Sequence, residues 1–511
     1  MAIAVKGERR CARRNKGEEL TMKDKIAVGL KLGIPIVVGI IIATLQPPEM
    51  LDHSAMVYMG IFECVIVWLI VDVMPDWAAV TIAMASFVVF GLTNLQGAFA
   101  PFADTTIWLV IGAFGLAAVV SKTGLLKRIA FFVSSLFPES YKGQVGALYT
   151  TGIVMSPLIP ALVAKGAILA PLATAISKSL GYVKSSKAAS GMFCAAWVSA
   201  GILGCAFLTG AAPCFIIIGM LPTDQQANWT VWMNWFLAAA VWFVVIAVLC
   251  YVAILVLYNP AKEKKAAGRK EANSDADTVA SSASAAPEIE HGFAKRQLRE
   301  MGPMSREEKI AGALLVLALV GWVFGSNIGL SNVVVTLIVF ALAGVTKLLT
   351  KNDVAERIPW GTVIFIGGVI SLASLILKLG IDKWLGTVMG PFIQPFASNP
   401  YLFILLICVL TYLLRFAIIS QTATMAIFLA ALSGVAVASG INLWVLLFVC
   451  YMASHVWHFP FTNNVYVAVL GSTNGQICEH KDTLPMNWAY MAINLVACLA
   501  SVPVWQMMGL M

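Results

Sequence analysis

Long apolar runs constrain this chain more than any other feature of its sequence. Of its 511 residues, 60% are hydrophobic and only 12% are charged, which is about half the charge of an ordinary soluble domain. Many runs reach the roughly 20 apolar residues that a helix needs to cross a bilayer. The sequence therefore predicts an all-α polytopic membrane protein, a multi-pass protein of the cell (inner) membrane.

The apolar spans fall into two groups on either side of a polar linker. Spans are expected at 26–46, 54–73, 77–93, 105–121, 191–221 and 231–258, and after the linker at 309–325, 329–347, 360–379, 441–471 and 486–509. The linker, 259–306, is rich in Ala, Ser, Lys and Glu and is expected to be a mobile loop. Two further apolar stretches, 143–177 and 401–437, are longer than one span, and Pro and Gly residues interrupt the first of them.

Positive charge predicts how these spans are oriented. Residues 1–25 carry eight Lys or Arg and the linker carries nine, so both are expected to be cytoplasmic. They stay on one side only if 143–177 is a re-entrant hairpin, with its tip near 161–166. The stretch 401–437 is then an inverted hairpin that enters from outside, and about eleven spans remain. Lys378 and Lys383 would lie outside, against the charge rule.

The two interrupted stretches contain the same element twice. Ala161–Ile168 (ALVAKGAI) aligns with Ser420–Ile427 (SQTATMAI), with three identities at an offset of 259. Upstream, Ile111–Leu125 aligns with Gly367–Ile381, with five identities in fifteen at an offset of 256. An odd number of spans between the copies makes them an inverted repeat. Secondary transporters built in this way hold their solute near the midplane.

The hairpin tips differ in polarity. The second begins Ser420-Gln421-Thr422, a cluster of hydroxyls and an amide of the kind that holds a small polar solute inside a membrane protein. The first copy has Ala, Leu and Val at these positions, and Lys165 stands where the second has Thr424. An ionisable residue in a broken intramembrane segment indicates function. We therefore expect the fixed ammonium to meet an anion, or to replace a cation.

The span after each hairpin is interrupted as well. Thr209-Gly210 lies within the run FLTGAAP, and Thr462-Asn463 lies within HVWHFPFTNN. Gly and Pro interrupt a helix, and Thr and Asn then offer hydrogen-bond donors and acceptors. Half-helix N-termini add partial positive charge. The sequence thus predicts an anion site between the tips and the breaks.

Three function classes compete, and the residues favour a secondary transporter of small organic dianions. A cation/proton antiporter needs buried carboxylates, but no Asp or Glu occurs in 143–221 or 401–471. The third class is a non-transporting membrane protein, such as an anchor or an enzyme, and it is not expected because no ATP-binding loop, metal cluster or nucleophile–base pair stands out. Neither a metal nor a cofactor is expected. The ten cysteines lack a CxxC pair and are expected to be small core residues. The net charge of +8 gathers at the N-terminus and does not suggest nucleic acid.

The order and spacing of these elements resemble the divalent anion/sodium symporter family of di- and tricarboxylate transporters. That family carries a Ser-Asn-Thr motif at each of two opposed hairpin tips, and Ser420–Thr422 resembles the second motif with Gln for Asn. Ser156–Lys165 resembles the first motif in the oxoglutarate/malate-translocator branch, where Ala-Arg follows the motif, as Ala164-Lys165 does here. The two Thr-containing breaks fall where the family's helix breaks line the site.

The resemblance implies an elevator-type transporter, in which the hairpins and broken helices move as one block against a scaffold, and a homodimer. The corresponding division is a basic cytoplasmic N-terminus at 1–25, scaffold helices at 26–104 and 307–358, a first repeat at 105–258 and a second repeat at 359–511, with the linker at 259–306. Family members hold sodium ions and substrate carboxylates at the tips and breaks.

The substrate site is therefore expected to comprise Lys165, Thr209, Gly210, Ser420, Gln421, Thr422, Thr462 and Asn463. Because the first tip lacks side-chain oxygens, the hypothesis is exchange of C4-dicarboxylates or related anions, with Lys165 in the place of a cation. A sodium-coupled symporter is the alternative, so Na⁺ remains a candidate coupled ion. Structural roles stay open: Lys165 snorkelling to the interface, and Ser420–Thr422 bonding neighbouring helices. The roles of Arg415, His455 and His458 also stay open.

Overall fold

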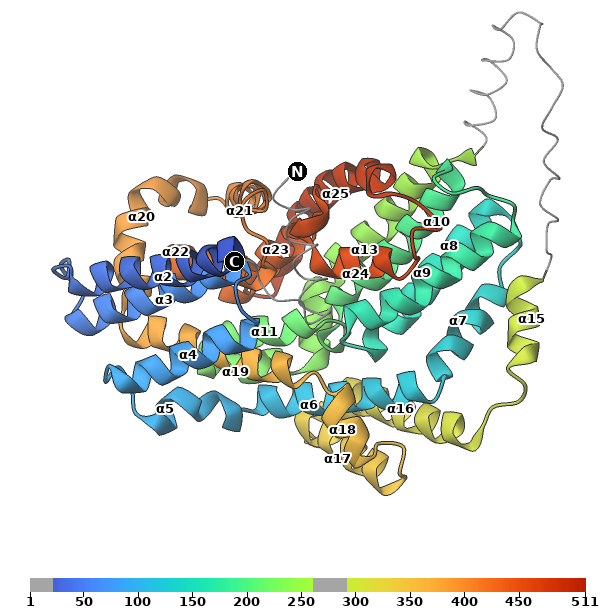
Figure 1. Cartoon of the computed structure of the whole chain (residues 1–511), viewed down its shortest axis with the longest axis horizontal. Coiled ribbons are helices and arrows are strands. Elements are labelled where there is room, and N and C mark those ends of the chain that lie inside the picture. The colour runs from blue at the N-terminus through green and yellow to red at the C-terminus, as the bar shows by residue number, and fades with distance from the viewer. Residues whose placement is uncertain (1–21, 261–291) are drawn as a thin grey trace, which may run out of the picture.

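The computed structural model describes residues 22–260 and 292–511 (Figure 1). Every regular element in these residues is helical. Nine of the described helices are long and apolar enough to cross a membrane, or up to ten if one bent pair counts as a span. Three shorter apolar helices, Asp76–Val89, Asn332–Val345 and Leu443–Ala453, occupy other expected spans. The all-α membrane fold is confirmed. Most of the expected N-terminal region and of the linker lies outside the described residues.

Two equivalent series of helices form the inverted repeat. The first contains α6 (Thr105–Lys122), α7 (Leu125–Ser135), α8 (Tyr141–Met155), α9 (Leu162–Ser179), α10 (Lys187–Trp197), α11 (Ala212–Met220) and, after the short α12 (Thr223–Trp229), α13 (Trp232–Leu257). The second contains α19 (Trp360–Lys378), α20 (Ile381–Ala397), α21 (Pro400–Leu414), α22 (Gln421–Ala438), α23 (Leu443–Ala453), α24 (Asn464–Gly471) and α25 (His480–Met507). The long final helices α13 and α25 pack against each other (Figure 1).

Seven further helices of the described residues precede the first repeat or lie between the two repeats, and some of them pack on the first helix of a repeat. They are α2 (Met22–Thr44), α3 (His53–Val71), α4 (Asp76–Val89), α5 (Leu95–Phe99), α16 (Arg306–Phe324), α17 (Asn332–Val345) and α18 (Lys351–Arg357). α6 packs on α17, and α19 packs on α4. Small residues permit these contacts, because a Cβ on Gly112 would overlap Thr336 and one on Gly368 would overlap Val80. The first helix of each repeat is thus attached to the predicted scaffold.

Prolines determine where the first hairpin turns. α8 ends at Met155, and Pro157 and Pro160, which lack an N–H and have a fixed φ, keep the chain out of a continuous helix. The loop therefore occupies 156–161, earlier than the expected 161–166. Lys165 lies in the first turn of α9, and Pro171 is accommodated within that helix. In the second hairpin, Ser420 caps α22 by accepting a hydrogen bond from the N–H of Ala423 at 3.2 Å.

Two helices that the apolar pattern did not predict connect the first helix of each repeat, α6 or α19, to the hairpin that follows it. α7 and α20 are amphipathic, and each begins after a glycine with positive φ, Gly124 at 81° and Gly380 at 68°. A residue with a Cβ is strained in this conformation, so glycine allows the sharp turn. α20 meets α21 at an angle of 117°. The two turns are 256 residues apart, the same offset as the upstream sequence alignment.

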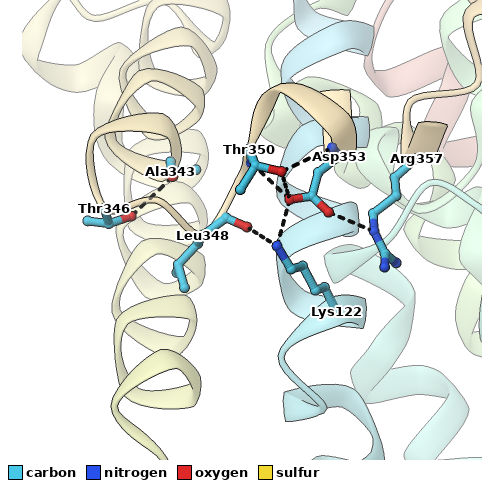
Figure 2. A network of polar contacts seen from close by, with 7 residues as sticks. All are labelled: Lys122, Ala343, Thr346, Leu348, Thr350, Asp353 and Arg357. Carbon is cyan, nitrogen blue, oxygen red and sulfur yellow. Dashed lines mark hydrogen bonds and ion pairs between the residues drawn. The ribbon is translucent and has the colours of Figure 1, made fainter. Parts of the chain in front are cut away.

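An ion-pair network fixes the end of α6 to α18 (Figure 2). The Lys122 ammonium donates to Asp353 Oδ2 at 2.6 Å and to the Leu348 carbonyl at 3.3 Å. Asp353 also accepts from Thr350 and from Arg357, whose Nε lies 2.9 Å from Oδ1. The hydrogen bond from Lys122, followed by that from Thr350, holds the pKa of Asp353 well below its usual range. The carboxylate therefore stays charged at physiological pH.

The last part of the expected linker is helical. α15 (Phe293–Glu300) packs on α7, where the Phe131 and Phe293 rings meet edge to face at 6.2 Å. All nine cysteines in the described part of the chain are buried and free. Their positions agree with the expected role as small core residues.

Candidate functional site

The first hairpin tip is bonded to the first helix break through Lys165. This lysine is fully buried, and its ammonium donates to the Gly210 carbonyl at 2.8 Å. Gly204 provides the necessary space, since a Cβ there would overlap Lys165 Nζ. The helix that carries Gly204 changes from α10 to a π-helical turn at Val198–Ile202 and then to single 3₁₀ turns, which frees backbone carbonyls. Two predicted site residues, Lys165 and Gly210, are thus in direct contact.

Thr209 strengthens the same contact. Its hydroxyl donates to the Pro157 carbonyl at 2.7 Å and accepts from Trp232 Nε1 at 3.1 Å. The Ala212 N–H donates to the Pro160 carbonyl at 2.9 Å. A Cβ on Gly210 would overlap the carbonyl oxygens of both Gly204 and Ser156. Glycine is therefore required for the approach of break and tip.

The second tip contacts the second break through Gln421. Its Nε2 donates to the Ser454 carbonyl at 3.1 Å, one residue after the end of α23. Thr422 is partly exposed and lines a crevice of about 10 Å³ between α22, α3 and α19. This volume suits about one water molecule. The crevice itself cannot hold a dicarboxylate.

The second break is closed by hydrogen bonds of its own residues. Asn463 caps α24, where its Oδ1 accepts from the Tyr466 N–H at 3.0 Å and its Nδ2 donates to the His455 carbonyl at 3.2 Å. The Thr462 hydroxyl donates to the Phe459 carbonyl at 2.8 Å. Thr462 and Asn463 are both buried. Their side chains hold the break in shape.

The two breaks meet each other inside the protein. Cys205 Sγ lies 3.5 Å from His455 Nε2 and 3.7 Å from the Tyr451 hydroxyl. Gly166 on α9 lets Val469 of α24 approach closely. Tip, break, break and tip therefore form one continuous series of contacts, to which Lys165, Thr209, Gly210 and Gln421 contribute hydrogen bonds between a tip and a break. The role of the eight predicted residues in binding stays a prediction.

Sequence reasoning left three basic residues open, and the structure places all three at the second tip or break. Arg415 is fully buried, and its Nη1 donates to the carbonyls of Ile418 and Ile419 at 2.8 and 2.6 Å. His455 Nδ1 lies 2.9 Å from the Tyr451 carbonyl. The His458 ring stacks on Phe416 with a centroid distance of 4.5 Å.

Four residues of the site were not predicted from the sequence: Cys205 and Tyr451, which contact His455, Asn487, which contacts His458, and Ser454, whose carbonyl accepts from Gln421. Asn487 is buried, accepts from the Trp457 N–H at 2.6 Å and lies 3.3 Å from His458 Nδ1. An amide within the expected span 486–509 was an available signal, whereas Ser454 contributes only its backbone carbonyl. Among residues 22–260 and 292–511, no group of three or more His, Cys, Asp or Glu gathers as metal ligands do.

Two opposed hairpins and two broken helices that meet within an inverted repeat define a helical membrane transporter. The chain belongs to the family described as the sodium:sulfate symporter transmembrane region, whose pattern matches residues 27–478. The resemblance to the divalent anion/sodium symporters is thereby confirmed. The protein is a transporter and not an enzyme.

Known relatives transport organic anions. The chain is 27% identical to the chloroplastic dicarboxylate transporter 1 of Spinacia oleracea over 355 residues, 68% of this chain and 58% of that protein. It is 24% identical to the L-tartrate/succinate antiporter of Escherichia coli over 413 residues, 76% of this chain and 80% of that protein. The solved YdaH transporter of Alcanivorax borkumensis shares the fold, with a TM-score of 0.52 and 15% identity over 94% of this chain and 97% of that one.

Proposed function

We propose that this protein is a secondary active transporter that exchanges small organic dianions, C4-dicarboxylates or related di- and tricarboxylates, across the cell membrane. The observation that carries the proposal is the Lys165 ammonium on the Gly210 carbonyl. In secondary transporters, carbonyls of unwound helices coordinate the coupling cation. Here the Lys165 side chain, in place of a cation, donates a hydrogen bond to such a carbonyl, that of Gly210. The printed functions of the relatives, dicarboxylate transport and tartrate/succinate antiport, support the same substrate class.

A fixed cation favours exchange for an electrostatic reason. Lys165 is fully buried, and no described carboxylate forms an ion pair with it. A buried charge without a partner is costly, so a bound anion stabilises the site while it crosses the bilayer. The ammonium cannot dissociate into solution as Na⁺ does. The binding site is therefore expected to cross back to the first side of the membrane more readily with another anion bound than empty.

Exchange is tested by uptake of labelled succinate and malate into liposomes that contain the purified protein. Uptake is measured with and without inward Na⁺, and with and without unlabelled internal dicarboxylate. We expect stimulation by internal substrate and none by Na⁺. Steep dependence on a Na⁺ gradient, together with activity that survives Lys165→Ala, would refute exchange.

Sodium-coupled symport is the second candidate, and the second tip is the observation in its favour. Ser420, Gln421 and Thr422 retain side-chain oxygens that the aligned Ala161, Leu162 and Val163 lack, and the family's description names sodium. Na⁺ would then be a coupled ion. Stimulation by Na⁺ alone in the same liposomes would support this alternative.

The predicted binding residues, division of the chain and topology belong to the same proposal. Lys165, Thr209, Gly210, Ser420, Gln421, Thr422, Thr462 and Asn463 surround the anion. The hairpins and broken helices move against the scaffold helices at 26–104 and 307–358 in a homodimer. Packing of α6 and α19 on that scaffold favours hinges at Gly124 and Gly380. The N-terminus is cytoplasmic and the membrane is the inner membrane. Accessibility of a tag at residue 1 tests the orientation.

A further inference from the structure

One edge of the Arg415 guanidinium has no partner among the described residues, although the side chain is fully buried. Nη1 is used by two carbonyls of the tip, those of Ile418 and Ile419. Nε and Nη2 are buried and have no hydrogen-bond partner. Arginine cannot lose its charge to relieve this situation, and unsatisfied buried donors are rare. Anchoring of the tip explains Nη1 but leaves the other edge unexplained.

The free edge is the one that suits a carboxylate. Nε–H and one N–H of Nη2 point in parallel, so that both oxygens of a carboxylate can accept from them. Arg128 shows the complete arrangement in the same protein. Its Nη1 donates to the Gly302 carbonyl at 2.8 Å, while Nε and Nη2 donate to the two oxygens of Glu308 at 2.8 and 3.1 Å. Arg415 repeats this geometry without the carboxylate.

No described carboxylate occupies the Nε–Nη2 edge of Arg415, since none in residues 22–260 and 292–511 forms an ion pair with it. The surrounding segment, 401–471, contains no Asp or Glu. A second buried donor lies in the same region. The Asn487 Oδ1 accepts from the Trp457 N–H, which fixes the orientation of the amide. Its Nδ2 therefore donates to His458 Nδ1. Because Nδ1 accepts, the proton of neutral His458 is on Nε2. His458 Nε2 is also buried, and no residue in the described part of the chain bonds it. Phe416, the neighbour of Arg415, stacks on this ring.

We propose that the Nε–Nη2 edge of Arg415 binds one carboxylate of the transported dianion as a bidentate pair. This inference rests on the proposed function and adds a residue outside the eight predicted ones. The substrate then lies between unlike cations, a guanidinium at the second tip and the Lys165 ammonium at the first. The guanidinium end selects a planar group with two acceptors.

The test compares binding of succinate with that of succinamate, in which an amide replaces one carboxylate. The purified full-length protein, Arg415→Gln and Arg415→Lys are titrated with each compound by isothermal calorimetry. We expect Arg415→Gln to weaken succinate binding by about 10- to 100-fold, the range for hydrogen bonds to charged groups, and to weaken succinamate as well, because succinamate can still present its one carboxylate to the guanidinium. Arg415→Lys keeps the charge and a donor for the tip, but also weakens succinate because it lacks the parallel edge.

The outcomes separate this inference from the proposed function. If the unaltered protein binds no dicarboxylate, the proposed function fails and the inference fails with it. If it binds succinate and either folded variant binds succinate as tightly as the unaltered protein, only the Arg415 proposal is refuted. If both variants unfold, a structure of the unaltered protein with succinate decides. A carboxylate within about 3.2 Å of both Nε and Nη2 is expected, and a carboxylate bound elsewhere overturns the proposal.

Discussion

Lys165 and Arg415 are two enclosed basic side chains, and their hydrogen bonds distinguish them. The Lys165 ammonium has found a backbone carbonyl in the facing break, whereas Arg415 bonds carbonyls of its own tip and keeps one edge free. The sequence indicated Lys165 because it replaces a hydroxyl within a repeated element. It could not indicate the free edge of Arg415, which depends on how the tip folds around the side chain.

Lys165→Gln is expected to reduce dicarboxylate exchange by about 10- to 100-fold, because it removes an ionised donor whose hydrogen bonds contribute about 1.5–3 kcal/mol. Initial rates of succinate exchange in liposomes measure the effect. Lys178→Gln is the matched control on the same helix, since the Lys178 ammonium bonds an exposed Gln476. Equal rates in both variants would assign Lys165 a structural role.

Gly210→Ala is expected to lower the thermal stability and to abolish exchange. Its Cβ would overlap two carbonyl oxygens, and overpacking of a close contact costs about 1–3 kcal/mol. Thermal unfolding in detergent measures the loss. Gly344→Ala, where a Cβ has open space on α17, should be neutral or stabilising by about 0.5–1 kcal/mol. Unchanged unfolding of Gly210→Ala would contradict the close approach.

At the scale of helices, apolar length with Pro and Gly interruptions predicted the first hairpin, and the repeated element predicted the second, whose stretch contains no proline. The expected 143–177 covers all but the outer ends of α8 and α9, and the expected 401–437 covers all but the outer ends of α21 and α22. α7 and α20 were missed because their apolar residues cover only one face, so neither forms an apolar run. The exact tip was also missed: a proline inside a helix, such as Pro171, and one that ends a helix, such as Pro157, look alike in sequence.

The Asp353 network makes a prediction about the attachment of α6. Asp353→Asn should lower the free energy of unfolding by about 1–3 kcal/mol, because Lys122 and Arg357 lose a charged acceptor. The pKa of Asp353 is depressed in the folded protein, so its contribution is present above its unfolded pKa of about 3.9 and is lost as the pH falls towards the lower, folded pKa.

Thermal unfolding of Asp353→Asn and of the unaltered protein should therefore differ by a constant amount from pH 5 to pH 8, and the difference should shrink in stronger acid. Glu356→Gln, an exposed carboxylate on the same short helix, is the control and should have little effect. A difference that disappears already between pH 8 and pH 5 would show that the ion pair does not stabilise α6.

Across the whole molecule, the two halves of the repeat are joined by buried polar contacts between α13 and α25 as well as between the breaks. Asn494 Oδ1 accepts from Trp242 Nε1 at 2.8 Å, and its Nδ2 donates to the Tyr412 hydroxyl at 3.1 Å. One amide therefore connects α13, α21 and α25. These contacts favour a block in which both hairpins move together.

Asn494→Leu should destabilise the protein by about 1–3 kcal/mol, because it leaves the Trp242 N–H unpaired in an apolar interior. Trp242→Phe removes that N–H, so the double variant should lose less stability than the sum of the single variants. Thermal unfolding of the four proteins measures this coupling. Strict additivity would show that the bond does not join the two halves.

The burial of every described cysteine has a practical consequence for observing transport. Thiol-reactive spin labels and fluorophores attach to accessible thiolates, and the nine cysteines in the described residues are buried. Once Cys11 is replaced, a pair of engineered surface cysteines at the exposed Val437 of α22 and Val345 of α17 would be labelled against a nearly silent background. Double electron–electron resonance could then record the displacement between hairpin and scaffold directly, with the native core left intact.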